Sequence, residues 1–343
     1  MTAPLSSLLP CSSPLRSAAL RPATLSSYDK HLSTFLLHTR LTLKQLLSSS
    51  PRRIDRALAS FMDWSYSHGG SYDYASHTLN ALIFYSPSLR LRLGESRLRL
   101  RGWSRIRTST SHPPITWELT VLFAITLAKW QRVEQAVACL LSFHCFLRVG
   151  ELTRLRYRDI IQPFDSRLGS AHTDMALRLA ETKTGNDQWV SITSTDVSSV
   201  LVRYLAHYFG SGEHNPLVFP FSPSSLRVSL RQLCAEFGLS SIPFVPHSFR
   251  HGGATCAHLL GSTIEQIMYR GRWKSMESAR RYIQTGRALY ADQTIPSELV
   301  HDGRILAQGI VNIFSTIIQA DSSSPLARRT RFNATVKRVR LRL

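Results

Sequence analysis

Apolar residues recur at three- and four-residue spacing along most of the chain, which indicates helices that each bury one face. In the N-terminal part this spacing covers residues 28–47, 54–67 and 75–84. Pro51, Gly69–Gly70 and Pro87 interrupt it and mark the ends of these helices. The spacing returns at 116–130, at 132–146 and from 195 to about 290. We therefore predict a mainly α-helical protein.

A period of two replaces the helical spacing between residues 175 and 192. Met175, Leu177 and Leu179 alternate with other residues, and so do Val190 and Ile192. A polar stretch from 182 to 187, with the sequence TKTGND, separates the two runs. This pattern predicts a β-hairpin with a longer loop. The expected fold class is thus mainly α with a small β-sheet or hairpin.

The segment from 89 to 107, LRLRLGESRLRLRGWSRIR, holds seven arginines and one acidic residue. Its alternation of Leu and Arg is typical of an amphipathic strand, or of a linker with one apolar and one basic side. A solvated charge run is the usual interpretation of such a segment. Because it lies between two predicted domains, a linker that contacts phosphates is an equal alternative. The candidate phosphate contacts are Arg97, Arg99, Arg101, Arg105 and Arg107.

Breakers and composition divide the chain into five parts. Residues 1–23 are rich in Ser, Pro, Leu and Arg, and we expect a disordered leader there, with an organellar transit peptide as the alternative. A helical domain and its basic linker follow at 24–110, and a second domain at 111–300. A helix is expected at 301–320. The segment 321–343 carries seven basic residues and is expected to be a basic tail.

The charge balance narrows the class of partner. The chain carries 42 Lys and Arg against 22 Asp and Glu, a formal net charge of +20. A protein this basic usually binds a polyanion, because neutralised phosphates release their condensed counterions. A basic membrane-surface protein is disfavoured, since no long basic amphipathic helix is evident. The longest apolar run, at 136–147, is interrupted by His144 and is too short to cross a bilayer.

The cysteines suggest neither a metal site nor a disulfide framework. The five cysteines are scattered, and no two stand in a CxxC pair. Cys139 and Cys145 lie in an apolar helical stretch, where they are expected to be buried thiols. Free thiols are typical of a reducing, intracellular compartment.

Candidate chemistry occurs in four short segments. The first, FLRVGEL at 146–152, places Arg148 after an apolar helix, with Glu151 three residues on as a potential ion partner that orients its guanidinium. The second is Lys183 in the hairpin loop. In the third, PHSFRHGG at 246–253, His247 and Arg250 share a helix face, and the glycines permit close backbone approach.

The fourth segment, GRWKSMESARRY at 271–282, contains Trp273 and Tyr282. Ser275 is expected to cap a helix that has Glu277 in its first turn, so Tyr282 falls near the end of the second turn. Taken alone, each of these four segments is more often structural than catalytic. Tyr282 by itself would be a half-buried packing residue.

Taken in this order, the four segments resemble the catalytic domain of the tyrosine recombinase/integrase family. Residues 112 to 290 carry the resemblance, and HSFRHGGAT, GRW and RRYI are most similar to recombinases of eukaryotic mobile elements and viruses. The positions that match the family pattern are Arg148, Lys183, His247, Arg250, Trp273 and Tyr282. One departure is Trp273, where many members have His; an indole can donate a hydrogen bond but cannot transfer protons as imidazole does.

The resemblance implies a reaction and a role for each residue. Tyr282 would attack a DNA phosphodiester and form a 3′-phosphotyrosine. Arg148 and Arg250 would stabilise the phosphate, with His247 as general base and Lys183 as general acid. Such chemistry needs no cofactor, no metal ion and no small-molecule substrate. The implied reaction is DNA recombination or integration.

The resemblance also implies an architecture and partners. A helical core-binding domain and a mixed α/β catalytic domain would bind double-stranded DNA, as a homo-oligomer (a tetramer) on that DNA. The apolar segment 305–318 would dock on a partner subunit or pack in its own core. The expected location is intracellular, in a nucleus or nucleoid, with no membrane association. Two alternatives stay open: a type IB topoisomerase-like relaxer, and an inactive DNA-binding derivative.

Overall fold

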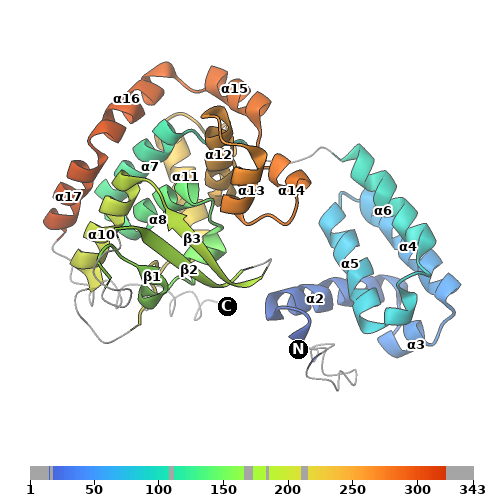
Figure 1. Ribbon diagram of the computed structural model, residues 1–343. Coiled ribbons are helices and arrows are strands. Elements are labelled where there is room, and N and C mark those ends of the chain that lie inside the picture. Colours follow the sequence, from blue (N-terminus) through green and yellow to red (C-terminus); the bar gives the residue numbers. More distant parts are fainter. Residues whose placement is uncertain are drawn as a thin grey trace. The chain divides into compact units, whose positions relative to one another are not determined.

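The computed structural model describes Leu15 and residues 18–107, 112–165, 173–182, 185–209 and 215–321. It falls into two compact units, residues 1–110 and 111–343 (Figure 1). Of the expected leader at 1–23 only Leu15 and residues 18–23 are described, and helix α2 already begins at Pro22; the expected tail at 321–343 lies outside the described residues beyond Asp321. Within this described part, no helix combines the length and the apolar character needed to cross a membrane.

The first unit is helical. Its elements are α2 (Pro22–Thr39), α3 (Leu43–Leu47), α4 (Pro51–Ser67), α5 (Tyr72–Tyr85), η2 (Pro87–Leu89) and α6 (Gly94–Ile106). Thr42, Ser50 and Ser71 cap the helices that follow them, each accepting a backbone N–H through its hydroxyl. The single helix expected over 28–47 is two helices, because Arg40 takes a left-handed conformation (φ 54°) and ends α2.

The prediction of a strand or linker over 89–107 is wrong, because most of this segment forms helix α6. Asp55 of α4 decides this, since its buried carboxylate accepts the backbone N–H groups of Glu95 and Ser96 at 2.9 Å each. These are unpaired donors of the first helical turn, so Asp55 caps α6 from another helix. Trp103 is buried farther along α6 and joins the core of the unit.

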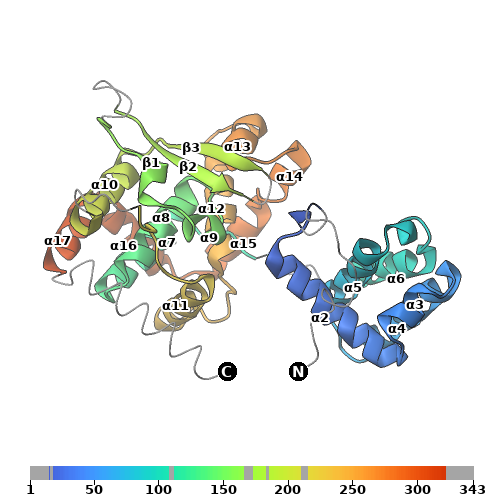
Figure 2. The same ribbon diagram turned by 90° about the horizontal axis from the view of Figure 1, so that it is seen from below.

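The second unit begins with two buried helices, followed by a small sheet. Its first elements are α7 (Trp117–Lys129), α8 (Val133–His144), α9 (Val149–Leu152), η3 (Tyr157–Asp159), β1 (Ile160–Ile161), β2 (Met175–Glu181), β3 (Asn186–Ile192) and α10 (Thr195–Phe209). The predicted hairpin is confirmed, with Leu177 opposite Val190 and β1 on the outer side of β2. The inward residues of β2 and β3 join the core formed by α7, α8 and α10 (Figure 2).

The rest of the second unit is helical. It comprises α11 (Pro223–Glu236), α12 (Pro246–Leu259), α13 (Ile264–Gly271), α14 (Met276–Arg280), α15 (Thr285–Thr294), α16 (Ser297–Gln308) and α17 (Ile310–Ala320). The single helix expected at 301–320 is thus two helices that meet at Gly309. α16 packs along α7 and α17 against α10 (Figure 1). Phe314 and Ile318 are buried, so this apolar segment packs in the core of its own chain.

Candidate active site

Helix α12 carries His247 and Arg250, and the two glycines that follow allow it to lie close to its neighbours. A Cβ atom on Gly252 would lie 1.9 Å from the carbonyl oxygen of Ile115, and one on Gly253 would lie 2.0 Å from that of Phe143. Only glycine tolerates such approach. The backbone of α12 therefore rests directly against the segment before α7 and against α8.

Tyr282 lies just beyond the short helix α14. Ser275 caps this helix and Glu277 stands in its first turn, as the sequence predicted, but the helix ends at Arg280. The half-buried ring of Tyr282 packs 4.6 Å from that of Trp273 and 5.3 Å from that of His247, measured between ring centroids. Nucleophile candidate, indole and imidazole therefore meet at one place.

Arg250 is completely buried below these rings. Its guanidinium carbon lies 4.6 Å from the ring centre of Trp273 and 5.1 Å from that of Tyr282. Two of its nitrogens donate to the carbonyls of Phe146 and Gly271, the latter over 2.7 Å. Burial first, and repulsion by Arg148 second, lower the pKa of Arg250 to about 9, so it is still charged at neutral pH.

A buried carboxylate, Glu151, joins Arg148 to this group. Its oxygens accept from Nη1 of Arg148 over 2.7 Å and from Nη2 of Arg272 over 2.9 Å, and they lie 4.0 Å from Arg250. Burial alone would raise the pKa of Glu151, but the three guanidinium groups lower it overall. The side chain of Arg148 is 19% exposed, so part of it can still reach an external anion.

The imidazoles of His247 and His251 on α12 are neutral at pH 7. Burial, followed by repulsion from His251 and Arg250, lowers the pKa of His247 to about 3. Burial likewise lowers the pKa of His251 to about 4. Because its pKa is lowered, His247 is in the neutral form that can accept a proton. A phosphate anion beside it would raise this pKa, because an opposite charge favours the protonated form.

Trp273 presents a donor without a partner. Its side chain is 7% exposed, and its indole Nε1 is buried with no hydrogen-bond partner among the described residues. Gly271 makes room for the ring, because a Cβ there would lie 1.8 Å from an indole carbon. A buried unpaired N–H is costly, and an acceptor beside the indole would satisfy this donor.

Five of the six residues that the resemblance selected lie together in the second unit: Arg148, His247, Arg250, Trp273 and Tyr282. Lys183 lies outside the described residues. The hairpin loop that contains it begins at Thr182, whose N–H donates to the carbonyl of Gly185 over 3.0 Å. The five arginines selected as phosphate contacts lie in the first unit, on or just after α6.

Sequence reasoning missed two participants. Arg272 was passed over as the residue before Trp273, yet its carboxylate contact places it in the guanidinium cluster. His251 was passed over although it lies four residues after His247, which on a helix means the same face. Its ring stacks on Tyr282 with centroids 4.7 Å apart.

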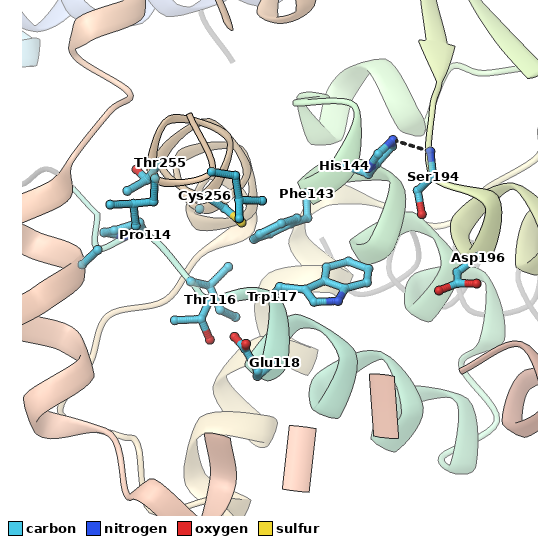
Figure 3. Close-up of a pocket in the computed structure, with 15 residues that line it drawn as sticks. Pro114, Thr116, Trp117, Glu118, Phe143, His144, Ser194, Asp196, Thr255 and Cys256 are labelled. Atoms are coloured by element: carbon cyan, nitrogen blue, oxygen red, sulfur yellow. Dashed lines mark hydrogen bonds between the residues drawn. The ribbon is translucent and has the colours of Figure 1, made fainter. Parts of the chain in front are cut away.

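A separate cavity of about 540 Å³ lies on another side of α12. Figure 3 shows Trp117 and Glu118 of α7 on one of its walls, and His144 with its hydrogen bond to Ser194 on another. None of the five catalytic candidates lines it, although it borders Thr255. Among the described residues, no cluster of His, Cys, Asp or Glu is arranged to hold a metal ion.

The chain is similar to known recombinases in its family pattern and fold. The model of the phage integrase family matches residues 118–287. The solved Tn1549 transposon integrase in complex with circular intermediate DNA is 16% identical, with a TM-score of 0.56 over 80% of this chain and 94% of that one. A lambda integrase dimer bound to a COC′ core site is also 16% identical, with a TM-score of 0.53 over 79% and 92% of the two chains.

No curated protein sequence matches the chain. The likeness to the solved structures concerns the fold, in which two units are mainly helical and the second contains a small sheet. The match to the family model spans all five clustered residues and the hairpin β2–β3. Residues 118–287, about half of the chain, therefore form a domain of the phage integrase family.

Proposed function

We propose that the chain is a site-specific DNA recombinase that cuts and rejoins double-stranded DNA through a 3′-phosphotyrosine at Tyr282. One observation supports this most directly. The ring centre of Tyr282 lies 5.3 Å from that of His247 and 4.6 Å from that of Trp273. It lies 5.1 Å from the guanidinium carbon of Arg250. A tyrosine that only fills space in a core would be expected to contact apolar side chains rather than a buried arginine and a neutral imidazole.

The cations of the site would stabilise the reacting phosphate. Negative charge grows on the non-bridging oxygens during in-line attack, and preorganised donors aimed at them supply most of the rate. Arg148 and Arg250 offer planar guanidinium donors, and the unpaired N–H of Trp273 offers a third group. Glu151 keeps the guanidinium groups in place before DNA arrives.

Two proton transfers accompany strand cleavage. The Tyr282 oxygen bonds to phosphorus while the bond to the 5′-oxygen breaks, and His247 takes the tyrosine proton. The departing 5′-oxygen needs a proton in turn, which we assign to Lys183. Attack by a 5′-hydroxyl reverses the step, so the bond energy is conserved and neither ATP nor a metal ion is consumed.

The DNA surface is proposed to include part of α6. Arg97, Arg101 and Arg105 are exposed and four residues apart, so they form one stripe along the helix. Arg99 instead pairs with Glu95 and Asp63. The charge of +20 favours the same partner. We further propose that several copies assemble on the DNA, in a nucleus or nucleoid.

Arg107 differs from the stripe residues as well. Its guanidinium lies over the ring of Tyr72, 3.9 Å from the ring centre, and 3.8 Å from a carboxylate oxygen of Asp73. Of the five arginines selected from the sequence, Arg99 and Arg107 thus pair with carboxylates of their own unit, and Arg97 donates to the backbone carbonyl of Arg90 over 2.8 Å. The stripe of three is the surface that we assign to phosphates.

The test is covalent trapping. The full chain is incubated with a random pool of nicked duplexes. On cleavage each duplex loses the short fragment that carries the free 5′-hydroxyl, so rejoining is prevented. The DNA in covalent adducts is then sequenced. Wild-type protein should form adducts at a defined sequence, and Tyr282→Phe should form none while it still binds DNA. Adducts persisting in Tyr282→Phe would sink the proposal. Adducts without sequence preference would favour a topoisomerase. The absence of any adduct with the wild-type protein would favour an inactive derivative.

A further inference from the structure

His251 is a buried histidine that has no role in the proposed reaction. Its side chain is 7% exposed, and its ring stacks on Tyr282 at an interplanar angle of 24°. It also meets the ring of His247 edge to face, with centroids 5.0 Å apart. The imidazole thus contacts both the general-base candidate and the nucleophile candidate, whose rings also contact each other.

The chain that follows Tyr282 is held by side chains of α12. Thr255 donates its hydroxyl to the carbonyl of Tyr282 over 3.2 Å, and accepts the backbone N–H of Gln284 over 3.1 Å. Nδ1 of His251 lies 3.4 Å from the same carbonyl of Tyr282. Because α14 ends at Arg280 and α15 begins at Thr285, Tyr282 lies between helices, where these contacts restrain it.

Gln284 also borders this imidazole. Its Nε2 lies 3.1 Å from Nδ1 of His251 and donates to the carbonyl of Arg281 over 3.2 Å. A neutral ring with its proton on Nδ1 donates to the carbonyl of Tyr282, whereas an Nδ1 without a proton could only accept from Gln284. Burial lowers the pKa of His251 and so favours a neutral ring.

Charged and titratable groups facing His251 from several elements also favour the neutral form. Arg250 lies on α12 itself. His112, before α7, and Arg287, on α15, lower the pKa of His251 further. Only the carbonyl of Tyr282 acts in the other direction.

We infer that His251 is a positioning residue for the nucleophile, which rests on the proposed role of Tyr282. Its ring supports one face of the tyrosine, and its Nδ1–H and the hydroxyl of Thr255, which both donate to the carbonyl of Tyr282, hold the backbone that follows. Attack in line with the leaving oxygen tolerates little error, and displacement by about 1 Å costs about 100-fold in rate. Tyr282 lies between two helices, so its backbone lacks the full set of hydrogen bonds that would restrain a tyrosine inside a helix.

The first experiment separates the hydroxyl of Thr255 from its volume. Thr255→Val keeps the shape but removes the donor, whereas Thr255→Ser keeps the hydroxyl. We expect single-turnover cleavage of the trapped substrate to fall about 10-fold in Thr255→Val and to stay within about twofold in Thr255→Ser. The dissociation constant for DNA should change by less than about twofold in both. Equal rates in Val and wild type would overturn the inference.

The second experiment divides the two functions of His251. His251→Ala loses both the ring and the donor, His251→Phe keeps the ring, and His251→Asn keeps a donor, its amide nitrogen, near the position of Nδ1. We expect cleavage to fall about 10- to 100-fold in Ala and less in Phe and Asn, with DNA binding unchanged. His258→Asn is the matched control, because His258 is exposed farther along the same helix, and it should cleave normally.

The pH profile distinguishes positioning from proton transfer. A positioning imidazole that stays neutral should leave the shape of the rate–pH curve unchanged in His251→Phe, with a uniformly lower rate. Loss of one limb of the curve would assign proton transfer to His251 and overturn the inference. The inference would also be overturned if the His251 variants lost cleavage, DNA binding and melting temperature in parallel, because that would indicate a purely structural role. If wild type forms no adduct dependent on Tyr282, the proposed function fails and the inference with it.

Discussion

The carboxylate of Glu151 accepts a hydrogen bond from Arg272, 121 residues away in the sequence, over 2.9 Å, with both side chains almost completely buried. Arg272 reaches it because its backbone is left-handed (φ 56°) at the end of α13. This contact joins α9, next to Arg148, to the loop that leads to Trp273. This buried ion pair therefore fixes the relative placement of the two, together with the bonds from Arg250 to the carbonyls of Phe146 and Gly271.

Replacement of Glu151 by Gln should destabilise the second unit strongly. The substitution leaves Arg148, Arg250 and Arg272 without their shared anion, and breaking a buried pair in this way typically costs about 3–5 kcal/mol. Chemical denaturation measures the loss. The control is Glu277→Gln, which removes a largely exposed pair with Arg281 and should cost less than about 1 kcal/mol. Similar losses in both would contradict the central role of Glu151.

Replacement of Gly252 by Ala should displace α12 from the segment before α7. The added Cβ would lie 1.9 Å from the carbonyl oxygen of Ile115, so the backbone has to move. We expect a loss of at least about 1–3 kcal/mol in the free energy of unfolding, together with slower cleavage. Gly102→Ala in α6 meets open space and should instead stabilise by about 1 kcal/mol. A neutral Gly252→Ala would show that the close contact is not required.

His144 should make the stability of the second unit depend on pH. Its Nε2 accepts the backbone N–H of Ser194 over 3.1 Å and that of Thr193 over 3.2 Å, which protonation would forbid. Burial first, and Arg270 second, lower its pKa from 6.5 to about 3. Because the unfolded chain binds this proton more readily, stability is complete above about pH 6.5 and is lost as the pH falls towards 3.

His144→Gln isolates this dependence, since an amide oxygen can accept the same N–H groups but does not titrate. The stability advantage of wild type over His144→Gln should shrink by about 1.4 kcal/mol per pH unit well below pH 6.5. Other histidines with lowered pKa values contribute equally to both proteins and cancel in the difference. Parallel stability curves from pH 8 to pH 4 would show that His144 does not titrate as described.

Removal of the stripe on α6 should weaken DNA binding in a salt-dependent way. Each phosphate that Arg97, Arg101 or Arg105 no longer neutralises lowers the slope of log affinity against log salt by about 0.9. The triple alanine variant should therefore show a visibly shallower slope in a fluorescence titration with duplex DNA. Arg99→Ala is the matched control, because Arg99 is paired with two carboxylates. An equal change in slope per residue would reject the stripe.

Local pattern predicted the helices and the hairpin well but failed where a distant side chain intervenes. The period-two alternation of Leu and Arg over 89–107 indicated a strand or linker. Asp55, about 40 residues earlier, caps α6 and makes the helical alternative stable. No residue within 89–107 indicates that Asp55 caps this helix. Conversely, Ser275 lies next to the helix it caps, and that start was predicted correctly.

The sequence alone determined the candidate catalytic residues, because their types and their order along the chain resemble one family. It also determined why Gly252 and Gly253 stand beside Arg250, since glycine in a helix implies close approach. Only the tertiary structure decided which side chains touch Tyr282. His251 and Arg272 become visible through stacking and a buried ion pair, and such contacts join positions that no local period relates. Long-range contacts depend on how helices pack, and sequence spacing describes only one helix at a time.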